Sequence, residues 1–150
     1  MNARPQIGDS PARILVVDDE RDNRELLEVI LGWEGFVILM AASGEEALAI
    51  VAEQPLDLIL LDVMMPGMNG YELAAKIKGG PATKSIPILI ITALADRDAR
   101  IRALSAGADD FLAKPLDRAE LVARVRNLLR PSRKMRTSPA VPVVPGNSRE

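Results

Sequence analysis

The chain contains neither cysteine nor histidine among its 150 residues. These two absences exclude thiol nucleophiles, Ser-His and Cys-His catalytic pairs, haem ligation by histidine, and zinc sites built on Cys or His. Aromatic residues are also scarce, at 3% of the chain. Any chemistry must therefore be carried by carboxylates, hydroxyls and amines.

Long apolar runs are absent as well. The longest uninterrupted one has only seven residues, 36–42, whereas a membrane-spanning helix needs about 18 or more. Residues 1–5 lead into no apolar segment of the kind found in signal peptides. We therefore expect a soluble, cytoplasmic protein that makes no membrane contact, and the lack of cysteine agrees with this expectation.

Charge is unevenly distributed along the chain. Residues 1–129 hold 14 Lys and Arg against 20 Asp and Glu, whereas residues 130–150 hold five basic residues and one acidic residue. A mildly acidic body is a poor nucleic-acid surface, so we expect no direct contact with nucleic acid. The basic end could touch an acidic partner, although a solvated linker is the simpler interpretation.

The length predicts one domain with short tails, and a domain of this size needs no disulfide or structural metal. Residues 1–12 contain two prolines and a glycine without periodicity, which is typical of a flexible leader. Residues 13–130 should form the domain, and residues 131–150 are expected to form a Pro-rich basic tail or linker. Two alternatives stay open: a stand-alone domain, or one excised from a longer protein.

Short apolar runs alternate five times with amphipathic stretches. The runs occupy residues 14–17, 36–40, 56–61, 86–91 and 110–113. Most are apolar on both faces, which favours strands of a parallel sheet with helices on each side. Because crossovers between parallel strands are right-handed, the pattern predicts an α/β fold, a doubly wound open (βα)5 sheet.

The amphipathic stretches carry signals for helix starts and ends. Ser43, Asn69 and Asp117 are each followed three positions later by Glu, the pattern of a capping box. Gly35 and Gly107 are candidate left-handed C-caps. Apolar residues at helical spacing predict the buried faces of the first and last helices: Leu26, Leu27, Ile30 and Leu31, and Leu121, Val122, Val125, Leu128 and Leu129.

Polar residues stand at the ends of four predicted strands: Asp18 and Asp19, then Asp62, Thr92 and Lys114. Parallel strands bring their carboxyl ends to one edge of the sheet, so we expect these residues to share a crevice. Two carboxylates about 4 Å apart repel by roughly 4 kcal/mol at an effective dielectric of 20, so cations or protons must compensate them. An all-oxygen donor set favours Mg²⁺. Such a site suits attack of a carboxylate on phosphorus.

Four segments resemble the receiver domain of two-component response regulators, including those of chemotaxis. They are residues 14–20 (ILVVDDE), 61–70 (LDVMMPGMNG), 91–93 (ITA) and 107–115 (GADDFLAKP). Any one segment is a weak signal, but four in order and register are specific, and the resemblance covers about residues 13–130. It implies a flavodoxin-like sheet of five parallel strands in the order 2-1-3-4-5.

The resemblance also implies the roles of the acidic residues. Asp62 would be the phosphoacceptor, and Asp19, Asp62 and the main-chain carbonyl of Met64 would hold Mg²⁺. Asp18 would act through a metal-bound water, and Lys114 would contact the phosphoryl oxygens. Because the chain has no histidine, the donor phosphohistidine must belong to a partner, either a sensor histidine kinase or a histidine phosphotransfer protein.

Thr92 and Phe111 occupy the family's switch positions. The resemblance implies that Thr92 moves to hydrogen-bond the phosphoryl group and that the rotamer of Phe111 follows. The small Ala93 would leave the site open to the donor. The Lys114–Pro115 peptide bond is a candidate for the cis isomer.

Met64 and Leu94 lie two positions after Asp62 and Thr92, where side chains of the family tune access of water. Both are apolar, so we predict slow loss of the phosphoryl group. The protein would catalyse only its own phosphorylation and dephosphorylation and would not otherwise be an enzyme.

The implied output is a population shift at the face formed by the fourth helix, the fifth strand and the fifth helix. This face carries charges of both signs, which would either pair across a symmetric homodimer or form a solvated surface. The charged residues are Arg97, Arg100, Arg102, Asp109, Asp110, Arg118 and Arg126.

Two other classes of protein share part of the pattern. A Mg²⁺-dependent phosphohydrolase with an aspartyl nucleophile commonly has a second Asp two residues later, where this chain has Met64. A dinucleotide or flavin binder needs a Gly-rich loop after the first strand, where Asp18, Asp19 and Glu20 would repel anions. Both alternatives therefore fit less well than a receiver.

Each candidate residue also has a structural interpretation when taken alone. Asp18 and Asp19 could cap the first helix, and Asp62 could belong to a turn. Lys114 could be a solvated charge, and Phe111 could simply fill the core. Only their joint placement at the ends of several strands favours a shared site.

Overall fold

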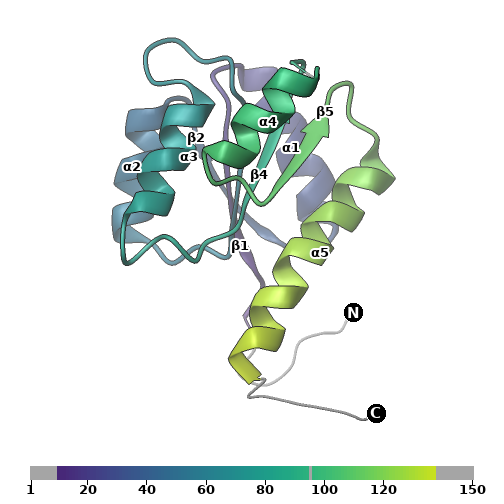
Figure 1. Cartoon of the computed structure of the whole chain (residues 1–150). Coiled ribbons are helices and arrows are strands. Elements are labelled where there is room, and N and C mark those ends of the chain that lie inside the picture. Colours follow the sequence, from purple (N-terminus) through teal and green to yellow (C-terminus); the bar gives the residue numbers. More distant parts are fainter. Residues whose placement is uncertain (1–9, 95, 138–150) are drawn as a thin grey trace, which may run out of the picture.

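A single parallel sheet of five strands forms the centre of the molecule (Figure 1). The computed structural model describes residues 10–94 and 96–137. The strand order is β2-β1-β3-β4-β5, which confirms the predicted flavodoxin-like order. The strands are β1 (Arg13–Val17), β2 (Val37–Ala41), β3 (Leu58–Leu61), β4 (Ile88–Thr92) and β5 (Asp110–Ala113).

A helix follows each strand, and the helices cover both faces of the sheet. They are α1 (Arg21–Trp33), α2 (Gly44–Glu53), α3 (Gly70–Gly79), α4 (Arg97–Ser105) and α5 (Arg118–Thr137). The α1 and α5 helices pack on one face, and α2, α3 and α4 pack on the other (Figure 1). The doubly wound (βα)5 architecture is therefore confirmed.

The core consists of two apolar clusters, one on each face of the sheet. Leu15 and Val17 of β1 belong to the cluster under α2, α3 and α4, whereas Ile14 and Val16 belong to the cluster under α1 and α5. Successive side chains of a strand point to opposite faces, so a strand covered on both sides must be apolar throughout. The uninterrupted runs in the sequence reflect this double burial.

Side-chain caps begin the three helices for which they were predicted, and Asp96 also caps α4. Oxygens of Ser43, Asn69 and Asp117 accept main-chain N–H groups of the first turns of α2, α3 and α5. Glu72 completes a reciprocal capping box with Asn69. These bonds satisfy donors that a helix start would otherwise leave without partners.

Two predicted glycine turns are also present, and β2, β3 and β4 begin one or two residues later than their apolar runs. Gly35 and Gly107 have φ of 92° and 103°, the left-handed region that glycine enters at little cost. The β4 strand begins at Ile88, two residues into the predicted run, because Pro87 has no N–H for the ladder.

The structure differs from the sequence interpretation at Leu26. This residue is 50% exposed, whereas Leu27 and Leu31 are buried against the sheet. The apolar stripe of α1 is therefore wider than the part of the helix surface that is buried against the sheet.

Contacts of the fold extend past residues 13 and 130. Ala12 is buried, and its carbonyl accepts the N–H of Val37. At the other end α5 runs to Thr137 and projects past the sheet (Figure 1). Pro131 lacks an N–H, but Arg, Lys and Met among the next residues favour helix. The rest of the predicted leader and tail, residues 1–9 and 138–150, lies outside the described residues.

Among residues 10–94 and 96–137, no helix combines the length and apolar character needed to cross a lipid bilayer.

Candidate functional site

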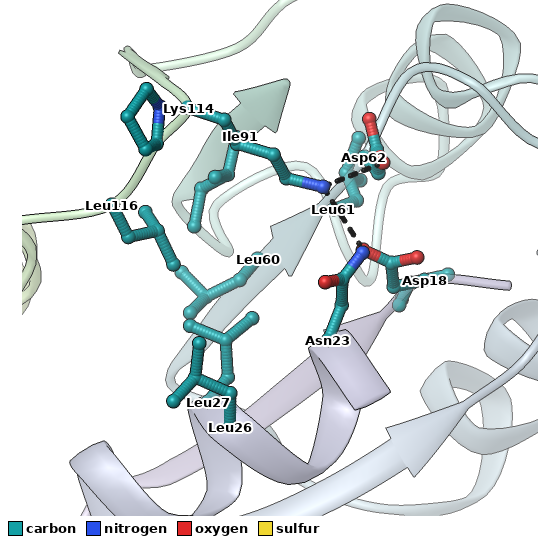
Figure 2. A pocket seen from close by; sticks show the side chains of 12 residues that line it. Asp18, Asn23, Leu26, Leu27, Leu60, Leu61, Asp62, Ile91, Lys114 and Leu116 are labelled. Carbon is teal, nitrogen blue, oxygen red and sulfur yellow. Dashed lines mark hydrogen bonds and ion pairs between the residues drawn. The ribbon is translucent and has the colours of Figure 1, made fainter. Parts of the chain in front are cut away.

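Asp18, Asp62 and Lys114 converge at the carboxyl edge of the sheet (Figure 2). The Lys114 Nζ lies 3.1 Å from Asp62 Oδ2 and 3.5 Å from Asp18 Oδ2. Both carboxylates are buried, with 8% of Asp62 and 3% of Asp18 exposed. The cation that compensates these two acids in the structure is therefore the ammonium of Lys114.

Asp18 is held by contacts from the start of α1. Its Oδ1 accepts the Glu20 N–H at 2.9 Å, and its Oδ2 accepts an N–H of the Asn23 amide at 3.2 Å. The Arg24 guanidinium donates to the main-chain carbonyl of Asp18 at 2.7 Å. The N-cap of α1 is Glu20, whose side chain makes no capping bond. Capping of α1 by Asp18 or Asp19 therefore does not account for the bonds from Asn23 and Arg24 to Asp18.

The start of α3 packs against the loop that carries Asp62. Its Oδ1 accepts the Met64 N–H at 3.3 Å, and the Gly70 N–H donates to the Val63 carbonyl at 3.0 Å. A Cβ at Gly70 would overlap the Asp62 carbonyl oxygen and come within 2.8 Å of the Val63 Cα. The loop that carries Asp62 therefore needs glycine at this position.

Two opposing effects act on the ionisation of Lys114. Burial, the largest single influence, disfavours the charged ammonium and lowers its pKa. The hydrogen bond to Asp62 and the charges of Asp62 and Asp18 together outweigh burial, so the pKa of Lys114 lies above its ordinary value. Lys114 is consequently a cation at neutral pH, and the interpretation as a solvated strand-end charge is wrong.

Thr92 lies at the end of β4 and is fully buried. Its Oγ1 accepts the Leu94 N–H at 3.2 Å, and its carbonyl accepts the Lys114 N–H at 2.9 Å. The neighbouring Ala93 is exposed. Met64 and Leu94 are 60% and 39% exposed and line one cavity of about 440 Å³.

Phe111 is buried in the core under α4. The Arg100 guanidinium carbon lies 5.1 Å from the centre of its ring, a cation–π contact. Burial alone would fit a plain core role, but the contact with α4 links this ring to the face predicted for output. The Lys114–Pro115 bond is cis, the isomer that the resemblance implies.

A second cavity, of about 330 Å³, lies beneath the Lys114 side chain. Its polar end lies at the right of Figure 2, and leucines of α1 and β3 line the part to the left of it. The lining residues are Val17, Asp18, Asn23, Leu26, Leu27, Leu60, Leu61, Asp62, Ile91, Lys114, Pro115 and Leu116.

The oxygen donors at this edge fit a hard divalent cation. Within the described ranges no group of three or more Asp, Glu, His or Cys side chains is arranged to hold a metal. The predicted set needs only two direct carboxylates, Asp19 and Asp62, with the main-chain carbonyl of Met64. Asp19 is exposed, and among the described residues its side chain makes no hydrogen bond or ion pair. Carboxylate and carbonyl oxygens are the ligands that Mg²⁺ prefers.

Most charges of the predicted dimer face have partners within the chain. Lys78 pairs with Asp109, and Arg124 pairs with Asp110, each at 2.9 Å. Arg118 and Arg126 both pair with Glu34, while Arg100 and Arg102 lie over the rings of Phe111 and Tyr71. These pairs favour the solvated-surface interpretation for the charges themselves.

The sequence interpretation missed three residues that shape the site: Asn23, Arg24 and Gly70. Gly70 carried a usable signal, because it follows the Asn69 cap directly after the acidic loop. Asn23 and Arg24 gave no such signal, since polar residues in a first helical turn are common.

Comparison with known proteins agrees with this geometry. The family model of the response regulator receiver domain matches residues 14–126. Response regulator PleD of Caulobacter vibrioides is 51% identical over 119 residues, which span 79% of this chain and 26% of PleD. Phosphate regulon transcriptional regulatory protein PhoB of Pseudomonas aeruginosa is 44% identical over 117 residues, which span 78% of this chain and 51% of PhoB.

A solved structure shares the whole fold. The CheY-like receiver domain protein of Methanospirillum hungatei superposes with a TM-score of 0.79 at 29% identity, over 84% of this chain and 99% of that one. The chain thus spans about a quarter of PleD and half of PhoB, but nearly all of a receiver structure. The family model and the similarity to PleD show that the chain belongs to the receiver-domain family of two-component response regulators.

Proposed function

We propose that the chain is a phosphorylation-driven switch in which Asp62 accepts a phosphoryl group from a phosphohistidine of a histidine kinase or histidine phosphotransfer protein. The observation that carries the proposal is the position of the Lys114 ammonium, 3.1 Å from the Asp62 carboxylate and 3.5 Å from Asp18. A buried acid beside a fixed cation suits a nucleophile that must receive an anionic group.

In the transfer, an Asp62 carboxylate oxygen forms a bond to phosphorus while the bond between phosphorus and the histidine nitrogen breaks. The electron pair of the broken bond stays on that nitrogen. Lys114 is placed to stabilise the phosphoryl oxygens once its pair with Asp62 opens. Mg²⁺, held by Asp19, Asp62 and the Met64 carbonyl with Asp18 through a water, would supply further positive charge for the transferred group.

The product changes the charge at residue 62 from −1 to about −2 and adds strong acceptor oxygens. We infer that Thr92 then exchanges its bond with the Leu94 N–H for one with the phosphoryl group, and that Phe111 follows. Arg100 contacts the Phe111 ring, so α4 responds to that movement. The output is a shift in population at the α4, β5 and α5 face.

The donor protein has a candidate docking surface on α1. Leu26, Val29 and Trp33 are 50%, 56% and 80% exposed and lie on one helical face, since their spacing is three and four residues. Leu26 also lines the cavity that reaches Asp62, so the stripe is continuous with the acceptor. Exposed apolar patches of this kind mark protein contacts. We propose that a helix of the phosphodonor protein covers it.

Val29→Ser tests the docking surface. It should slow transfer from a phosphorylated donor protein several-fold and leave phosphorylation by acetyl phosphate unchanged, because only the protein needs the stripe. Equal slowing with both donors would contradict the assignment. Trp33 is the single tryptophan of the chain, so its fluorescence reports donor binding directly.

We propose a cytoplasmic protein whose only catalysis is its own phosphorylation and dephosphorylation. PhoB is named as a transcriptional regulator, but residues 1–129 of this chain are mildly acidic, and we propose that they make no direct contact with nucleic acid. Any such activity would reside outside the receiver.

Incubation with histidine-phosphorylated partners and, separately, with generic phosphate esters separates the switch from a phosphohydrolase. The switch should acquire one phosphoryl group per chain from the partner and release little phosphate from the esters. Sustained release of phosphate over many turnovers would support the enzyme instead. The Lys114→Ala variant should lose the response in either case.

A further inference from the structure

We propose that Asn23 is a positioning residue of the acceptor site, whose side-chain amide holds the Asp18 carboxylate toward Lys114 and Asp62. This inference rests on the proposed function. Asn23 lies on the third helical position of α1 and points to Asp18 at the polar end of the cavity (Figure 2). It belongs to none of the four motifs that identify the family.

The amide nitrogen of Asn23 joins two acidic side chains. Its Nδ2 donates to Asp18 Oδ2 at 3.2 Å and to Glu20 Oε1 at 3.1 Å. Both hydrogens of the amide nitrogen are therefore used on carboxylates, which fixes the rotamer of Asn23 as well as that of Asp18. A solvent-exposed side chain on a helix surface would not donate to two carboxylates in this way.

The two oxygens of Asp18 are held from different directions. Oδ1 accepts the Glu20 main-chain N–H, and Oδ2 accepts the Asn23 amide. Each carboxylate oxygen can accept about two hydrogen bonds, so one direction remains on Oδ2, and Lys114 approaches it at 3.5 Å. Asn23 thereby orients the carboxylate without filling the position that faces Asp62.

This arrangement matters when the cation at the site changes. If Lys114 turns to the phosphoryl group, Asp18 loses its ion-pair partner but keeps the bonds from Glu20 and Asn23. The carboxylate then stays in place to accept a hydrogen bond from a metal-bound water. Outer-shell partners of this type commonly alter metal affinity by about 10- to 100-fold when they are removed.

The test compares Asn23→Leu with Asn23→Gln in the full chain. Leucine has similar size but no donor, whereas glutamine retains the amide. Glu28→Ala, on the exposed face of the same helix, is the matched control. Mg²⁺ alone is titrated into each unphosphorylated protein and followed by the amide NMR signals around Asp62, with thermal unfolding in EDTA as a measure of folding.

Asn23→Leu should weaken Mg²⁺ binding by about 10-fold, with Asn23→Gln recovering part of the loss and Glu28→Ala unchanged. With acetyl phosphate as donor, the Mg²⁺ concentration for half-maximal rate should rise by a similar factor, while the rate at saturating Mg²⁺ changes less. Mg²⁺ binding by Asn23→Leu within twofold of wild type would overturn the role of Asn23. Failure of the wild type to accept any phosphoryl group would instead overturn the proposed function, and the Mg²⁺ titration still decides the role of Asn23.

Discussion

At the scale of single residues, the site depends on one ammonium between two buried acids. Lys114 is only 23% exposed, and it contacts both Asp62 and Asp18. Two carboxylates this close are stable only with a compensating cation. In the structure this cation is the Lys114 side chain. We therefore expect a bound metal ion and Lys114 to compete in neutralising the charges of Asp62 and Asp18.

Lys114→Met tests this competition. In EDTA the free energy of unfolding should fall by about 1–3 kcal/mol, because Asp62 and Asp18 lose a charged hydrogen-bond partner. Addition of Mg²⁺ should restore part of the loss, and Mg²⁺ should bind the variant more tightly than the wild type. Denaturant titrations with and without Mg²⁺ measure both effects, with the exposed Lys76→Met as control. A destabilisation that Mg²⁺ leaves unchanged would contradict the competition.

Met64 and Leu94 give a second prediction at this scale. Both are exposed, apolar and adjacent to one cavity, so neither side chain orients an attacking water. We predict a slow loss of the phosphoryl group from the wild type and a several-fold faster loss from Met64→Asn, whose amide can position water. Leu104→Asn, at an exposed site on α4, is the control. A phosphoryl lifetime on the order of seconds in the purified wild type would contradict the prediction.

At the scale of elements, the start of α3 supports the loop that carries the acceptor. Asn69 and Glu72 form the capping box, and Gly70 packs directly against the main chain of Asp62 and Val63. The helix start and the acceptor loop are therefore in direct contact. A change in this contact should affect both the fold and the site.

Gly70→Ala should lower the free energy of unfolding by about 1–3 kcal/mol, because the added Cβ meets rigid backbone. It should also slow phosphorylation by acetyl phosphate, since the displaced backbone carries Asp62. Gly79→Ala is a matched control at the other end of α3, where a Cβ would meet nothing within 4 Å. Equal stability of the two variants would show that the overlap at Gly70 is relieved without cost.

The elements were the most predictable part of the molecule. Ser43, Asn69 and Asp117 cap helices as their sequence pattern predicts, because a cap depends on residues only three positions apart. Strand ends could be placed together because parallel topology determines which edge they share. The exposed Leu26 could not be predicted, since helical periodicity does not say how much of an apolar stripe the sheet covers. The bonds from Asn23 and Arg24 to Asp18 depend on side-chain rotamers and were likewise out of reach.

At the scale of the whole molecule, the face predicted for output contains few unpaired charges among the described residues but two exposed apolar residues. Ile101 and Leu104 on α4 are 47% and 53% exposed, while most neighbouring charges are paired within the chain. The α4 helix itself buries only the small residues Ala99 and Ala103. Any contact between two copies on this face would therefore be mainly apolar.

Phosphorylation should convert the protein from monomer to dimer if the α4, β5 and α5 face pairs with a second copy. Sedimentation of the phosphorylated chain should then show twice the mass, and Ile101→Ser should remain monomeric. Val29→Ser is the control and should still dimerise, because α1 packs on the other side of the sheet from α4. An unchanged mass of the wild type on phosphorylation would remove the dimer from the account and leave the switch intact.

The central claim is that Asp62 is the phosphoacceptor, and mapping the phosphoryl group tests it most directly. The chain is phosphorylated with Mg²⁺ by a histidine-phosphorylated partner, and the acyl phosphate is reduced with borohydride, which converts a phosphorylated aspartate to homoserine. We expect one modified residue per chain, at position 62, and no incorporation in Asp62→Asn, with the exposed Asp22→Asn labelled like the wild type. Label that persists in Asp62→Asn, or that maps to another residue in the wild type, would contradict the claim.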